Sequence, residues 1–203
     1  MVKVKICGIT NLEDALFSYF AGAGALGFVF YKKSPRYIQP RQAKNISKIL
    51  PKRILRVGVF VDEKMPTVRR IAREVRLDML QFHGQESPAY CRKFKDYKVI
   101  KAFRIGKKED LNKVLQYKTF AYLFDSFSKT SLGGTGKKFN WKILAQAARM
   151  KPVVFISGGL TSGNVIKAVS LLKPDWVDAS SSLESSPGKK DHRKVKRFIQ
   201  ALS

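Results

Sequence analysis

Reactive and charged side chains recur in this 203-residue chain after short apolar runs, either at the end of the run or, for Arg36, in the loop that follows Phe30. In chain order, these positions hold Cys7, Arg36, Asp62, His83, Arg104, Asp125, Ser157-Gly158-Gly159 and Ser180-Ser181-Ser182. Each run is typical of a buried strand, and the carboxyl ends of parallel strands in a barrel lie on one face. The pattern therefore predicts one site that is assembled from many strand ends.

Cys7 and Asp125 are the candidates for an acid–base pair. A proton shuttle at a sugar carbon needs one group that accepts a proton and another that donates one. A thiol becomes a competent base where nearby positive charge favours the thiolate, and this chain is rich in Lys and Arg. A lone cysteine is more often a small buried hydrophobe, which is how we interpret Cys91 on its predicted helix. His83 is either a substrate contact or a hydrogen-bonded structural histidine.

The last two strand ends predict a phosphate site. Gly158 and Gly159 precede a predicted helix, and Ser180, Ser181 and Ser182 form a hydroxyl-rich turn. Glycine-rich loops after the seventh and eighth strands, next to a helix N-terminus, commonly hold phosphate in barrel enzymes. Ordinary turn chemistry would explain the same residues, because Gly and Ser also mark plain loops.

Eight strand-then-helix units position these residues. The expected strands are 2–6, 25–30, 54–61, 78–82, 98–103, 119–124, 153–156 and 176–179. The first helix is expected to open at Thr10 with Glu13 in a capping box, and another to start near Trp141. Eight such units predict an α/β protein with one (β/α)8 (TIM) barrel domain over residues 1–203. An open doubly wound sheet is the alternative.

Composition limits the classes of function. No run of about 18 apolar residues occurs, so no membrane span is expected, and no signal peptide is visible. Two cysteines cannot form a disulfide framework and no His/Cys spacing indicates zinc, so we expect a cytoplasmic protein.

The chain carries a net charge of +25, from 40 Lys and Arg against 15 Asp and Glu. That excess raises the alternative of a basic nucleic-acid-binding barrel without activity. The basic residues are scattered in pairs without interleaved aromatic platforms, so we expect a solvated surface that steers an anionic substrate rather than a nucleic-acid partner.

Seven motifs in chain order resemble the phosphoribosylanthranilate isomerase family. They are Lys5-Ile-Cys-Gly-Ile-Thr10, Gly27-Phe-Val-Phe-Tyr31, Ser34-Pro-Arg-Tyr-Ile38, Gln81-Phe-His-Gly84, Gly133-Gly-Thr-Gly136, Ser157-Gly-Gly-Leu160 with Asn164-Val165, and Pro187-Gly-Lys-Lys-Asp191. The resemblance implies an Amadori rearrangement of a phosphoribosyl aldose in tryptophan biosynthesis. It implies neither metal nor cofactor.

The resemblance also implies roles for individual residues. Asp125 would be the general acid that opens the ring, and Cys7 the general base that removes the C2 proton. Arg36 would pair with the anthranilate carboxylate, for which a guanidinium fork is suited. Gly158, Gly159 and the Ser180–Ser182 turn would hold the phosphate. The chain departs from the family at Ser182, where Gly is usual.

Another sugar-phosphate isomerase or epimerase remains an alternative from the same class. A metal-dependent epimerase should offer histidine and acidic ligands, and this chain has only two histidines. The oligomeric state is expected to be a monomer or a homodimer.

Overall fold

Eight parallel strands close into a barrel in the computed structural model of the chain, which describes residues 1–105, 110–125 and 153–202. The strands are β1 (Lys3–Cys7), β2 (Ala25–Val29), β3 (Leu55–Phe60), β4 (Met79–Phe82), β5 (Lys98–Arg104), β6 (Ala121–Asp125), β7 (Val153–Ser157) and β8 (Trp176–Ala179). Each strand pairs with the next, and β8 closes the ring on β1, where Lys5 faces Asp178. The predicted (β/α)8 barrel is confirmed, and the open doubly wound sheet is wrong because β1 and β8 are not edges.

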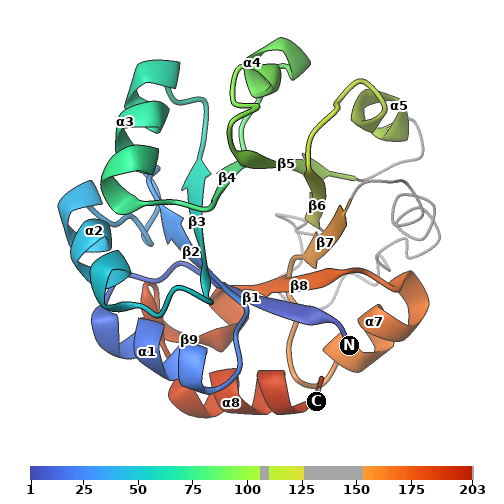
Figure 1. Cartoon of the computed structure of the whole chain (residues 1–203). Helices are drawn as coiled ribbons and strands as arrows, with labels where there is room; N and C mark the ends of the chain where they lie inside the picture. The colour runs from blue at the N-terminus through green and yellow to red at the C-terminus, as the bar shows by residue number, and fades with distance from the viewer. Residues whose placement is uncertain (106–109, 126–152, 203) are drawn as a thin grey trace.

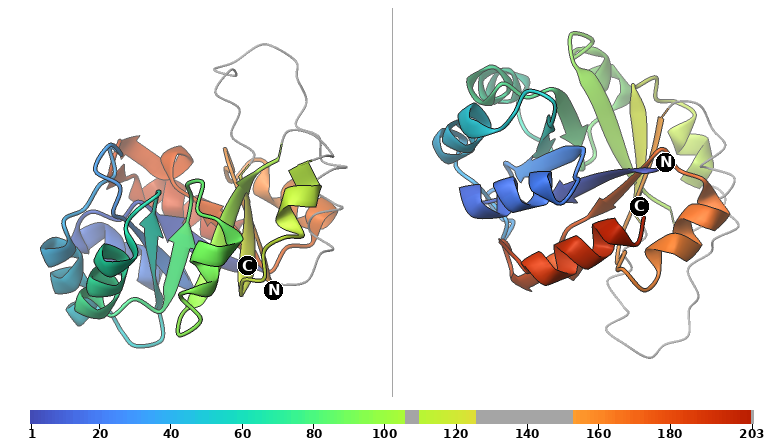
Figure 2. Two further views of the ribbon diagram at one scale, coloured as in Figure 1. Left: turned by 90° about the horizontal axis from the view of Figure 1, so that it is seen from above. Right: turned by 60° about the horizontal axis from the view of Figure 1, so that its bottom comes forward.

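Helices surround the barrel (Figure 1). They are α1 (Leu12–Phe20), α2 (Pro40–Ile49), α3 (Met65–Val75), α4 (Pro88–Arg92), α5 (Asp110–Val114), α7 (Val165–Leu172) and α8 (His192–Gln200). The two chain ends lie close together in both views of Figure 2. The helix expected near Trp141 and the Gly133–Gly136 motif fall outside the described residues. Among the described helices, none is long and apolar enough to cross a bilayer.

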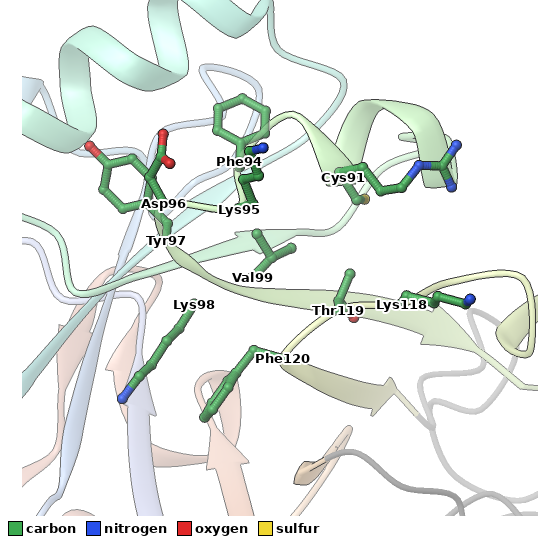
Figure 3. A pocket seen from close by; sticks show the side chains of 11 residues that line it. Cys91, Phe94, Lys95, Asp96, Tyr97, Lys98, Val99, Lys118, Thr119 and Phe120 are labelled. Atoms are coloured by element: carbon green, nitrogen blue, oxygen red, sulfur yellow. The ribbon is translucent and has the colours of Figure 1, made fainter.

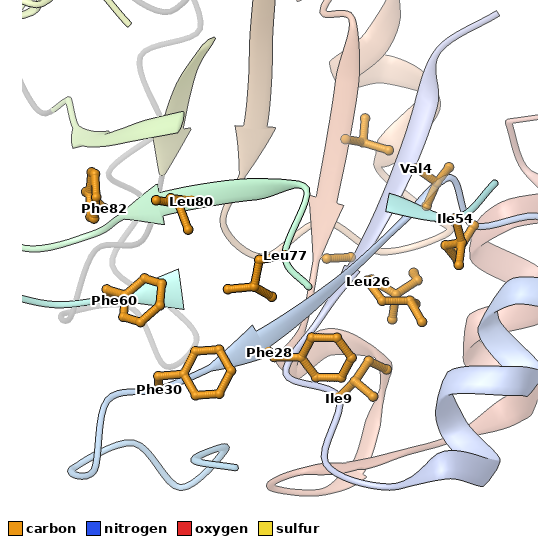
Figure 4. Close-up of a cluster of buried hydrophobic side chains, with 14 of the residues drawn as sticks. Val4, Ile9, Leu26, Phe28, Phe30, Ile54, Phe60, Leu77, Leu80 and Phe82 are labelled. Atoms are coloured by element: carbon orange, nitrogen blue, oxygen red, sulfur yellow. The ribbon is translucent and has the colours of Figure 1, made fainter. Parts of the chain in front are cut away.

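Alternation along the strands separates two apolar layers. Leu26, Phe28, Phe60 and Phe82 are fully buried between the strands and the helices (Figure 4). The alternate positions pack into a second cluster inside the barrel, which includes Val57, Met79, Ile100, Phe155 and Trp176. Successive strand residues point to opposite faces. By the same alternation Lys5, Cys7, Gln81, Asp125 and Asp178 share the inward parity.

The start of α1 differs from the prediction. Asn11 is the N-cap, because its side-chain oxygen accepts a hydrogen bond from the Asp14 N–H at 2.8 Å. Thr10 instead donates its hydroxyl to the carbonyl of Gly188, at 2.5 Å. The expected capping box at Thr10 and Glu13 is therefore wrong, and Thr10 ties the β1 loop to a segment near the end of the chain.

That late segment is a short hairpin that the hydrophobic pattern does not predict. A 3-10 turn, η1 (Ser181–Leu183), follows β8 and leads into β9 (Glu184–Ser186), which pairs antiparallel with β10 (Lys189–Lys190). Gly188 makes the turn with φ of 82°, a backbone conformation that favours glycine. The hairpin brings Glu184 and Lys190 toward the loops that follow the strands.

Candidate active site

Cys7, His83 and Asp125 all lie at the carboxyl ends of barrel strands. Cys7 ends β1, Asp125 ends β6, and His83 directly follows β4. The His83 Nε2 atom is 3.4 Å from Asp125 Oδ2. On its other side, His83 Nδ1 lies 3.0 Å from the side-chain nitrogen of Gln81, a residue that is only 1% exposed. The structure therefore brings His83 and Asp125 together, with Gln81 orienting the ring.

Cys7 lies beside a glycine of the neighbouring strand β2 and near a charged residue of its own strand β1. It is 8% exposed, and in the register of β1 with β2 it faces Gly27. A Cβ atom at position 27 would lie 2.6 Å from the Cys7 sulfur, so the glycine leaves the space that the thiol occupies. Burial raises the pKa of the Cys7 thiol, while the positive charges of Lys5 and Lys190 act in the opposite direction.

The second cysteine lies on α4 and not at the end of a barrel strand. Cys91 is 3% exposed and packs with the apolar residues under α4, as the sequence predicted. Burial raises the pKa of Cys91 to about 11. A thiol of that kind is inert near neutral pH, because the thiolate is the reactive form.

Arg36 is held by a carboxylate that the sequence analysis missed. Its Nε and Nη2 atoms donate to Glu184, with the shortest contact at 2.7 Å from Nη2 to Oε2. Lys190 donates to the same carboxylate at 2.9 Å. Burial alone would raise the pKa of Glu184, but the hydrogen bonds from Arg36 and Lys190 hold it below its ordinary value. Only the turn at Pro187-Gly188 hinted in the sequence that this carboxylate could fold back.

The two loops predicted to bind phosphate lie side by side and are joined. Gly158 and Gly159 follow β7 with φ values of 96° and 62°, and a Cβ atom at Gly159 would meet nothing within 4 Å. The Ser182 hydroxyl donates to the carbonyl of Leu160 at 2.5 Å, which links the loop after β8 to the loop after β7.

The loop after β8 also offers unused donors. The Ser180 hydroxyl oxygen is buried and has no hydrogen-bond partner among the described residues. Ser181 and Ser182 open the 3-10 turn η1, and the first N–H groups of a helical turn have no partner inside it. Free N–H groups and a spare hydroxyl are the chemistry that a phosphate oxygen requires.

Asp62 and Arg104 line a cavity of about 330 Å³ that opens beside His83. Asp62 has an organising role there, because its carboxylate accepts the N–H of Gln85 at 2.6 Å and so shapes the loop after β4. A Cβ atom at Gly84 would lie 2.4 Å from that carboxylate. Asp62 is therefore already used within the loop.

A second hollow lies at the opposite end of the strands. It is lined by residues around the start of β5, among them Lys98, Lys118 and Phe120 (Figure 3). Lys98 and Arg104 mark the two ends of β5, so this hollow opens at the amino ends of the strands. None of the predicted site residues lines it, and it is not the candidate active site.

Fold and site together define a (β/α)8-barrel enzyme with its polar groups at the carboxyl ends of the strands. A family model described as N-(5'phosphoribosyl)anthranilate (PRA) isomerase matches residues 4–201. The chain belongs to this family of isomerases of tryptophan biosynthesis.

Individual relatives agree over nearly the whole chain. N-(5'-phosphoribosyl)anthranilate isomerase of Geobacter sp. strain M21 is 50% identical over 199 residues, which cover 98% of this chain and 97% of that protein. The crystal structure of phosphoribosyl anthranilate isomerase from Thermotoga maritima is 45% identical, with a TM-score of 0.93 over 99% of this chain and 98% of that one.

A solved complex is also similar. It is phosphoribosyl anthranilate isomerase with reduced 1-(o-carboxyphenylamino)-1-deoxyribulose 5-phosphate bound, at 43% identity and a TM-score of 0.90, covering 99% of this chain and 98% of that one.

Proposed function

We propose that this protein converts N-(5'-phosphoribosyl)anthranilate into 1-(o-carboxyphenylamino)-1-deoxyribulose 5-phosphate, with Cys7 as general base and Asp125 as general acid. The observation that carries the proposal is the placement of both groups at inward positions on one barrel end, on β1 and β6. The ligand of the similar complex, a reduced form of that product, supports the choice of substrate.

Ring opening needs a proton on the furanose oxygen. Asp125, as the neutral acid, donates this proton while the bond between C1 and the ring oxygen breaks. The lone pair of the anthranilate nitrogen then forms the C1=N bond of a protonated Schiff base. His83, 3.4 Å from Asp125, is positioned to exchange a proton with it, and we retain His83 as a candidate substrate contact.

The second step breaks the C2–H bond. The Cys7 thiolate takes the proton and becomes a thiol, the C–H electron pair forms the C1=C2 bond, and the C1=N pair returns to nitrogen. The resulting enolamine gains a proton at C1 and loses one from the C2 hydroxyl, which gives the ketone. The proton that Cys7 gains balances the one that Asp125 gives, so the substrate is isomerised with no net proton consumed. Proton exchange with solvent then returns Cys7 to the thiolate and Asp125 to the acid.

Binding groups complete the proposal. Glu184 uses the Nε side of Arg36, so the remaining guanidinium donors are available to the anthranilate carboxylate. Gly158, Gly159 and the Ser180–Ser182 turn would hold the phosphate through N–H and hydroxyl donors. A catalytic thiol requires reducing conditions, which is why we propose a cytoplasmic location; both cysteines are free in the structure.

Steady-state kinetics of Cys7→Ser and Asp125→Asn test the proposal. Consumption of enzymatically generated substrate is followed by the loss of its anthranilate fluorescence. Each variant should lose at least about 100-fold in kcat, because a positioned acid or base contributes 10²–10⁴-fold. Cys91→Ala is the matched control and should keep normal kcat. Undiminished kcat in either site variant, with the reduced product analogue still bound, would overturn that residue's role.

A further inference from the structure

A lysine and an aspartate form an ion pair inside the barrel, directly beneath Cys7. The Lys5 Nζ atom lies 2.9 Å from Asp178 Oδ1, and the two residues face each other in the register of β1 with β8. Lys5 is fully buried, and Asp178 is 4% exposed. Lys5 lies two residues before Cys7 on the same face of β1, and the two side chains interact electrostatically.

Folding alone does not account for this pair. Two buried charges must be removed from water, and a well-packed apolar pair of similar size is often as stable or more so. The barrel interior accepts apolar side chains at neighbouring inward positions, which are occupied by Val57, Met79 and Trp176. The charges of Lys5 and Asp178 are therefore retained where they can act on a neighbouring group, and Cys7 is that neighbour.

We propose that Lys5 and Asp178 act as positioning residues that set the balance between thiol and thiolate at Cys7, with Lys5 favouring the thiolate and Asp178 opposing it. Asp178 holds the Lys5 ammonium in place through their ion pair, and the positive charge of Lys5 acts on the neighbouring Cys7 thiol more strongly than that of Lys190 does. This inference rests on the proposed function only for its catalytic consequence.

The effects of neighbouring charges on the pKa values of Lys5 and Cys7 have the directions that this proposal requires. Burial favours neutral Lys5, but Asp178 and Cys7 raise the pKa of Lys5 above its ordinary value, so the ammonium persists. Burial raises the pKa of the Cys7 thiol, Lys5 and Lys190 act to lower it, and Asp178 adds to the increase. Burial raises the pKa of Asp178, and the charges of Lys5, His83 and Asp125 also act on this carboxyl. Within residues 1–105, 110–125 and 153–202, these charged groups have the largest effects on Cys7 and its ion pair.

The test is a titration of the Cys7 thiol in the substrate-free protein. The ultraviolet absorbance of the thiolate is recorded against pH for each variant and for its Cys7→Ser counterpart, and the difference isolates Cys7 from Cys91 and the tyrosines. Lys5→Met should move the Cys7 titration to higher pH, and Asp178→Asn should move it to lower pH. Lys101→Met is the matched control, because Lys101 is also buried and pairs with a carboxylate, Glu86, at 2.9 Å. It should leave the Cys7 titration in place.

Kinetics supply the second readout. In Lys5→Met, kcat at neutral pH should fall about tenfold or more with KM nearly unchanged, and should recover as the pH rises, because general-base catalysis depends on the pKa of the base. If Lys5→Met fails to fold, the double variant Lys5→Met/Asp178→Asn removes both charges. Its Cys7 thiol should still titrate at a higher pH than the Cys7 thiol of the parent protein. Asp178→Asn is an independent test, because it should shift the Cys7 titration in the opposite direction, to lower pH.

Two results would overturn the inference: a Cys7 titration in Lys5→Met that coincides with the parent protein, or one in Asp178→Asn that moves upward. Failure of the proposed function has a different signature. Cys7→Ser would then keep its activity, whatever the thiol titration shows.

Discussion

The Arg36 guanidinium and the Glu184 carboxylate are joined by three hydrogen-bond contacts across 148 residues of sequence. Lys190 holds the same carboxylate from the other side. The ion pair fixes the Arg36 side chain, which is still 22% exposed and so remains accessible to a ligand. A pre-oriented guanidinium loses little side-chain entropy when it binds a second carboxylate.

Arg36→Met should therefore mainly raise KM for the carboxylated substrate, by about tenfold or more, with a smaller effect on kcat. Loss of an interaction that substrate and transition state share raises KM alone. Steady-state kinetics over a range of substrate concentrations measure this. Arg69→Met is a suitable control, since Arg69 pairs with the exposed Asp96 on the surface. A change in melting temperature with unaltered kinetics would show that Arg36 only serves the ion pair with Glu184.

Gly27→Ala should impair the reaction by displacing Cys7. The added methyl would lie 2.6 Å from the Cys7 sulfur and 3.1 Å from its Cα atom, so the strand or the thiol must move. Overpacking of this kind costs about 1–3 kcal/mol, and kcat should fall together with the melting temperature. Gly163→Ala is the control, because a Cβ atom there meets nothing closer than 3.8 Å. Normal kcat in Gly27→Ala would mean that the position of Cys7 is not critical.

Ser182→Ala and Ser182→Gly should both raise KM severalfold. Ser182 does not have a positive φ, so there is no backbone strain for glycine to relieve. Its hydroxyl joins the two candidate phosphate loops through the Leu160 carbonyl, and loss of such a bond costs about 1 kcal/mol. Ser185→Ala, in the exposed hairpin, is the control for losing a serine hydroxyl. A Ser182→Gly protein with a higher melting temperature and a lower KM would contradict this role.

The strands could be predicted because each is a short apolar run, and all eight are found within two residues of the expected bounds. The closed barrel followed from their number. The Cys7 and Asp125 positions could be predicted because strand-end residues in a parallel barrel converge by topology. Glu184 and Lys190 could not, since β9 and β10 are too short and too polar to show a hydrophobic period. The buried position of Lys5 could not be predicted either, because a lysine within a strand is normally expected on the solvent-exposed face.

Single-turnover kinetics with substrate deuterated at ribose C2 test the division of labour between Cys7 and Asp125 most directly. Excess enzyme removes product release from the measured rate, so only the chemical steps contribute. In Cys7→Ser, breaking the C2–H bond should limit the rate, and deuterium should slow the reaction severalfold. In Asp125→Asn, ring opening should limit the rate, and deuterium should have little effect. The opposite pattern, with the isotope effect in Asp125→Asn and none in Cys7→Ser, would contradict the assignment of Cys7 as the base.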